Sequence, residues 1–136
     1  MVTQTTRYGI GVTVRLPYHR AVERIREELA KEGFGVLTEI DVQATMKQKL
    51  DVDFRPYVIL GACNPPIAHQ ALTAELDIGL LLPCNVVVYQ GDEPGTSVVA
   101  AMDPVEALAL TGRADIMPLA EQVKAKLARA LEGVAA

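Results

Sequence analysis

Alternation of apolar and other residues near the amino terminus is the feature that most constrains the fold of this chain. Between Tyr8 and Leu16 every second residue is apolar, and glycine, threonine or arginine fills the positions between. A period of two residues is typical of a β-strand with one buried face, because successive side chains point to opposite sides. The chain must therefore form a sheet and a second layer that covers one face of it.

The next segments add a helix and further strands. Val22, Ile25 and Leu29 recur at helical spacing before Gly33, which predicts an amphipathic helix over 17–32. Alternation predicts a strand over 36–44, and the four-residue spacing of Met46 and Leu50 suggests a helical turn or two within 45–53. More strands are expected at three β-prone runs, the last two as a hairpin: 57–62, 86–90 and 97–102.

Three helices complete the prediction. One is expected over 65–77, where Pro65 suits a first turn, and another starts with Asp103 as its N-cap and ends before Gly112. The last helix is predicted over 116–131. Strands and helices do not alternate strictly, so a doubly wound parallel sheet fits poorly. We expect one α+β domain over 1–136, with a mostly antiparallel sheet and helices on one face.

Charge and composition exclude several classes of function. The formal net charge is −4, which argues against binding of nucleic acid, because that needs a basic face. Arg20, Arg24 and Arg26 lie close together and could form a local basic patch, but we expect them on a solvated helix face. No apolar run reaches the roughly 18 residues of a membrane span, and residues 1–6 are polar, unlike a signal peptide. We therefore expect a cytoplasmic protein with reduced cysteines, and a Cys63–Cys84 disulfide is the alternative.

Two cysteine-containing corners are the candidate functional site. Cys63-Asn64-Pro65-Pro66 lies where a predicted strand passes into a helix, and Pro83-Cys84-Asn85 lies where the next strand begins. Amides at a helix start favour a thiolate, and Asn64 suits an N-cap. If the two strands are neighbours, Cys63 and Cys84 come within reach of each other. The alternative is that both cysteines only pack, since cysteine is often buried as a small apolar residue.

Glu75 is a second unusual residue. A helical wheel over 65–77 places it on the apolar side, between Ala68 and Ala71. A buried carboxylate is costly unless it is paired or protonated. Glu75 therefore either forms a salt bridge, to Lys49 or an arginine, or supplies polarity to a pocket.

A metal site is a weaker hypothesis. Cys63, His69 and Cys84 together would suit a soft metal such as zinc or copper(I). No Cys-x-x-Cys pair supports this set, so we expect no cofactor or resident metal.

The cysteine corners also carry a family resemblance. Together with Asp103-Pro104, the segments Tyr57–Pro65 and Gly79–Val86 resemble a bacterial and archaeal family of domains of unknown function, number 302, and the likeness covers nearly the whole chain. The resemblance implies a two-layer fold like that of the TATA-binding protein, with a curved antiparallel sheet, and a homodimer. It implies no established activity, and a shared fold does not transfer DNA binding.

Three functional hypotheses remain from the sequence. The preferred one is a small binding module for a small ligand or soft metal, whose candidate residues are Cys63, Asn64, Glu75, Cys84 and Asn85. The alternatives are a thiol enzyme of redox or sulfur chemistry, with Cys63 as nucleophile and Cys84 as its resolving partner, and a structural protein with packed cysteines. Whether the chain is an enzyme stays open.

Overall fold

One open sheet of six strands organises the chain. The structure, a computed structural model, describes residues 1–136. The sheet order is β1-β2-β6-β5-β4-β3, and every neighbouring pair is antiparallel. The predicted α+β class with an antiparallel sheet is therefore confirmed. The strands are β1 (Thr3–Thr6), β2 (Gly9–Val14), β3 (Gly35–Asp41), β4 (Tyr57–Cys63), β5 (Cys84–Gln90) and β6 (Ser97–Met102).

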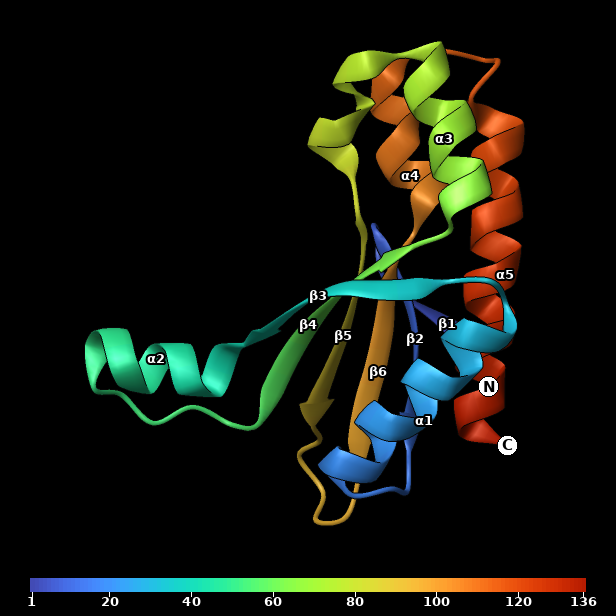
Figure 1. Ribbon diagram of the computed structural model, residues 1–136. Helices are drawn as coiled ribbons and strands as arrows, with labels where there is room; N and C mark the ends of the chain where they lie inside the picture. Colours follow the sequence, from blue (N-terminus) through green and yellow to red (C-terminus); the bar gives the residue numbers. More distant parts are fainter.

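Helices cover only one face of this sheet (Figure 1). The α-helices are α1 (Tyr18–Lys31), α2 (Val42–Leu50), α3 (Pro65–Ala74), α4 (Pro104–Leu108) and α5 (Met117–Ala135), with 3-10 helices η1 (Leu76–Leu81) and η2 (Ala109–Thr111). Helices α1 and α5 lie on the covered face, whereas α3, η1 and α4 lie beyond one end of the sheet beside the first half of α5. Helix α2 stands apart from the body on the side of the uncovered face. None of these helices has the length and apolar character needed to cross a membrane.

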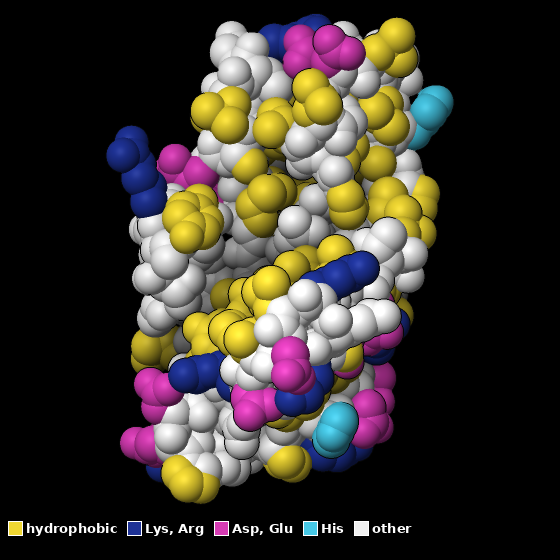
Figure 2. Space-filling model, turned by 90° about the vertical axis from the view of Figure 1, so that its left-hand side faces the viewer, with side chains coloured by type: hydrophobic (Ala, Val, Ile, Leu, Met, Phe, Trp, Pro, Cys, Tyr) yellow, Lys and Arg dark blue, Asp and Glu magenta, His cyan; other side chains and the backbone are white.

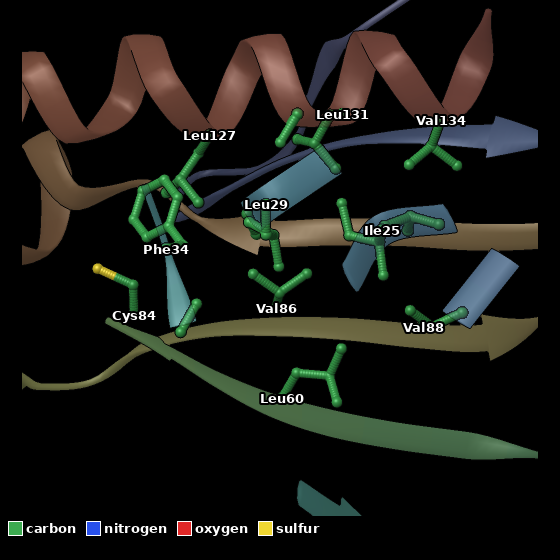
Figure 3. Packing of buried hydrophobic residues seen from close by; sticks show 14 of the residues in the cluster. Ile25, Leu29, Phe34, Leu60, Cys84, Val86, Val88, Leu127, Leu131 and Val134 are labelled. Carbon is green, nitrogen blue, oxygen red and sulfur yellow. The ribbon is translucent and has the colours of Figure 1, made fainter. Parts of the chain in front are cut away.

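The hydrophobic core is divided into two clusters. The larger contains 21 buried residues and lies between the sheet and α1 and α5, with Ile25, Leu29 and Leu131 facing Val86 and Val88 of β5 (Figure 3). The smaller consists of five buried residues from α3, η1, α4, α5 and the N-cap of α5: Ala71, Ile78, Leu108, Ile116 and Ala120. Helix α5 contributes to both clusters and so ties the end layer to the sheet.

Three of the differences from the predicted elements have a clear physical reason. Strand β1 was not predicted, because its polar sequence TQTT has no buried face and lies fully exposed at the sheet edge. The strand predicted over 36–44 ends at Asp41, whose side chain accepts a hydrogen bond from the Ala44 amide (2.9 Å) and so begins α2. The helix predicted over 65–77 ends at Ala74, since Glu75 has extended backbone (φ −153°, ψ 112°).

Candidate functional site: an apolar cavity at the cysteine corners

An apolar cavity separates the two core clusters. Its volume is about 350 Å³, and 13 of its 18 lining residues are hydrophobic. Ligand pockets in proteins range from about 300 to 1,000 Å³ and are mostly apolar, so this cavity is large enough for a small molecule. The lining residues are Phe34, Leu37, Thr38, Ala62, Cys63, Asn64, Ile67, Ala68, Ala71, Leu72, Gly79, Leu82, Pro83, Cys84, Pro104, Leu108, Leu119 and Val123.

Sheet pairing brings the two cysteines to this cavity. Strands β4 and β5 are neighbours, and Ala62 pairs with Cys84, so that Cys63 is the residue next to this pair at the end of β4. Both thiols are free, Cys63 half-buried and Cys84 buried, and both line the cavity. Cys84 belongs to the larger cluster, and its sulfur points away from the other labelled side chains of that cluster (Figure 3). The predicted neighbourhood of the two strands is therefore observed and both corners line one cavity, but the two thiols are free and form no disulfide.

Asn64 lines the cavity and connects it to the end of α1, but its side chain does not cap α3. It occupies the N-cap position, but its side chain makes no cap hydrogen bond and instead donates from Nδ2 to the Glu32 carbonyl oxygen (3.3 Å). Gly33 beside it has a positive φ of 83°, a conformation that a glycine adopts without strain. This turn at the end of α1 carries the chain directly to Phe34, which enters both the core and the cavity lining.

The electrostatics of the cavity favour uncharged groups. No Asp, Glu, Lys, Arg or His is among its lining residues. Burial raises the pKa of the Cys84 thiol from its ordinary value to about 11, and the neighbouring Cys63 adds a smaller contribution in the same direction. Cys84 is therefore a neutral thiol at physiological pH, because burial in apolar surroundings disfavours the charged form.

Glu75 does not reach the cavity, contrary to the expectation of a polar group in a pocket. It is the C-cap residue of α3 and about one third exposed, and its Oε1 lies 3.7 Å from Nη1 of Arg113. The same guanidinium donates to the Ala74 carbonyl oxygen (2.6 Å) and pairs with Asp115. Because α3 ends before Glu75, the helical wheel did not apply, and the alternative of a salt bridge to an arginine is the one observed.

Asn85 and His69 also lie outside the cavity. Neighbouring residues of a strand point to opposite faces, so Cys84 faces the covered side while Asn85 lines a groove on the uncovered side. His69 is exposed on α3. Cys63, His69 and Cys84 do not come together, and no group of three His, Cys, Asp or Glu side chains is arranged to hold a metal ion.

Several lining residues were not predicted from the sequence as site residues. From sequence alone an apolar side chain that borders a cavity cannot be distinguished from one that fills a core. This applies to Phe34, Leu72, Leu82, Leu108 and Leu119. One signal was present for Phe34, an aromatic residue directly after the helix-terminating Gly33. The space itself depends on packing between distant helices, which residue patterns do not encode.

The raised pKa of Cys84 predicts a pH-dependent stability. A thiol whose pKa is higher in the folded than in the unfolded state contributes to the stability of the fold. This contribution is complete below the pKa of the unfolded state and is lost as the pH rises through the folded-state pKa of about 11. Compared with Cys84→Ala, the wild-type free energy of unfolding should fall by about 1 kcal/mol more between pH 8 and pH 10. Urea titrations of both proteins measure the difference, and equal pH slopes would contradict the buried neutral thiol.

The fold and its cavity define the class of protein: a two-layer α+β domain with an open antiparallel sheet and an apolar cavity at one end of it. A family model described as "Domain of unknown function DUF302" matches residues 10–134, and the chain belongs to this family. Among solved structures it is similar to the uncharacterized conserved protein DUF302 from Bacillus stearothermophilus, at 32% identity and a TM-score of 0.86, covering 95% of this chain and 99% of that one. No curated protein matches the chain.

Proposed function

We propose that this protein is a small binding module that takes up an uncharged, mainly apolar small molecule in the cavity at Cys63 and Cys84. The observation that carries the proposal is the position of this cavity between two hydrophobic clusters. Closing such a space would bring more apolar surface into contact, so an open one forgoes packing energy. A ligand that fills it restores those contacts.

The cavity walls define the chemistry of the ligand. Without a charged lining residue, the cavity offers no counter-ion to a carboxylate, phosphate or ammonium group, and desolvating such a group there is costly. Thr38, Asn64 and the two thiols are the polar groups that can orient a single hydroxyl, carbonyl or similar end. The ligand class is thus a compact hydrocarbon-like molecule with at most one neutral polar group.

A thiol enzyme is less well supported by the same features. A resolving cysteine needs accessible thiolate, whereas the pKa of Cys84 is raised to about 11 by burial. No His, Asp or Glu lines the cavity to act as a base. We therefore assign the two cysteines to the cavity wall, where a soft, weakly polar surface suits an apolar ligand.

Cellular context and assembly are part of the proposal. Two neighbouring free thiols are consistent with a reducing compartment, and we propose the cytoplasm as the site of action.

We also propose that the working form is a homodimer, because one face of the sheet has no covering layer.

Titration with a neutral apolar dye, 1-N-phenylnaphthylamine, tests ligand binding. Dye fluorescence should rise on binding to the wild type with saturation at one site per chain. Ala68→Phe places a ring where a lining residue of α3 now leaves space, and it should weaken dye binding about tenfold or more. Straight-chain alcohols of increasing length should then displace the dye from the wild type until the chain length exceeds the cavity.

Ala74→Phe is the matched control on the same helix. Ala74 is exposed and does not line the cavity, so the same substitution there should leave dye affinity unchanged. Equal affinity of the two variants and the wild type would show that the dye binds elsewhere, and the cavity would then lose its assigned role.

A further inference from the structure

The exposed residues of the cavity lining show where the cavity opens to solvent. Three lining residues are exposed, Leu37 and Thr38 near the start of β3 and Gly79 in η1, and the others are buried or half-buried. Figure 1 shows β3 directly below the end layer, which is formed by α3, η1 and α4. Figure 2 views the molecule from the side of α2, with hydrophobic side chains on the end layer and on the central projection and a hollow between them. The mouth of the cavity therefore lies between β3 and the end layer.

A β-bulge places Leu37 at this mouth. Val36 pairs with Ala62 and Thr38 pairs with Gly61, so Leu37 is an extra residue without a partner in β4. Bulges re-aim a side chain, and they are frequent at sheet edges and beside functional sites. Leu37 is 67% exposed and still lines the cavity, so an apolar side chain stands between the cavity and solvent. Exposed side chains change rotamer within nanoseconds, and Leu37 can therefore move aside without a change in the backbone.

The rim beside Leu37 is fixed by close packing. A Cβ atom at Gly61 would collide with Thr38 Oγ1 and with Pro83 Cγ, so these two side chains meet over the bare backbone of a glycine. Both of them line the cavity. This part of the rim cannot widen unless β3 or the segment before β5 shifts, which leaves Leu37 as the movable part of the mouth.

Polar groups of the lining are unevenly distributed. The Thr38 hydroxyl is exposed and the Cys63 thiol half-buried, whereas buried lining residues such as Leu108 and Val123 are apolar. Asn64 is buried, but its amide nitrogen already donates to a backbone carbonyl. A polar group buried without a hydrogen-bond partner is costly, so the polar end of a ligand is best placed at the mouth.

We infer that Leu37 is the gate of the cavity and admits a single-tailed amphiphile, whose neutral polar end stays at the mouth beside Thr38 while its alkyl tail lies inside. The inference rests on the proposed function and specifies the ligand class, the entrance and the orientation of the ligand in the same cavity. A linear primary alcohol is the simplest member of this class. As a gate, Leu37 sets how fast the ligand enters and leaves more than how tightly it is held.

Stopped-flow fluorescence with 1-N-phenylnaphthylamine tests the gate. Leu37→Ala should raise the association and dissociation rate constants of the dye together, each about tenfold, and should change Kd by less than about threefold. Ile40→Ala is the matched control, because Ile40 lies on the same strand, is 49% exposed and does not line the cavity. It should keep the wild-type rates. Faster dissociation alone in Leu37→Ala would make Leu37 an ordinary wall residue and overturn the gate.

Displacement of the dye by three alcohols of equal alkyl length tests the orientation. A second hydroxyl at the far end of the chain has to be buried among apolar residues, so 1,8-octanediol should bind about tenfold or more weakly than 1-octanol. In 2-(octyloxy)ethanol the added polar atom lies at the same end as the hydroxyl, and this ether should bind about as tightly as 1-octanol. Equal weakening by the two additions would overturn the orientation.

The outcomes separate the gate from the proposed function. Dye that does not bind the wild type, or that binds Ala68→Phe just as tightly, would refute the binding module and the gate together. Dye that Ala68→Phe weakens, but whose rates are the same in Leu37→Ala and Ile40→Ala, would refute the gate and leave the binding module standing. Faster entry and exit in Leu37→Ala alone is the result we expect.

Discussion

Replacing Leu29 by alanine is expected to lower the free energy of unfolding by about 3–5 kcal/mol, the range for large-to-small changes in a tightly packed core. Leu29 is fully buried on α1, between Leu131 of α5 and Val86 of β5 (Figure 3). Its removal takes contacts from both layers at once, and neither layer can move to close the space without breaking the other's packing. Chemical denaturation of the two proteins measures the difference.

Leu110→Ala provides the reference for the same chemical change at the surface. This leucine is 77% exposed on η2, and its truncation should change the free energy of unfolding by less than about 0.5 kcal/mol. Leu29 does not line the cavity, so the folded fraction of Leu29→Ala should bind the apolar dye as tightly as the wild type. A large fall in dye affinity would mean that the two core clusters are not independent.

Such a division of the core explains which parts of the fold were predictable from sequence. Residues 8–16 show a clear period of two residues, and the runs 57–62, 86–90 and 97–102 were predicted as strands because they are apolar and β-prone. All four segments contribute to the larger cluster. The amphipathic helix ending at Gly33 was equally clear. Elements without a buried face gave misleading patterns, since alternation in β3 continued into a helix that no core residue anchors.

The candidate site was predictable only in part for related reasons. Cys63 and Cys84 were found because two strand ends carry them, and pairing of adjacent strands is a local rule. Asn85 was expected at the site because it follows Cys84 directly. Neighbouring residues of a strand point to opposite faces, so Asn85 lies on the uncovered face. Glu75 was misplaced because α3 ends one residue before it, where Arg113, a residue distant in the sequence, donates to the last carbonyl of the helix. Long-range side-chain contacts of this kind leave no periodic signal.

Asp103→Ala should be the most damaging substitution outside the apolar core, at about 2–3 kcal/mol. Asp103 is only 2% exposed. One carboxylate oxygen accepts from the Val105 amide (2.9 Å) at the start of α4, and the other lies 2.8 Å from Nζ of Lys124 on α5. Alanine removes the N-cap and leaves the ammonium group without its partner. Lys124 is 41% exposed and can turn to solvent, which keeps the cost below that of a fully buried pair.

Asp103→Asn separates the two contributions, because its side-chain oxygen still caps α4 while the charge is lost. It should retain about half of the stability that the alanine variant loses. Pro104 and Leu108 follow this cap and line the cavity, so Asp103→Ala should also weaken dye binding, and Asp103→Asn less so. Dye affinity that is unchanged in both variants, despite lower stability, would mean that α4 keeps its position without the cap and that α5 alone holds the cavity wall.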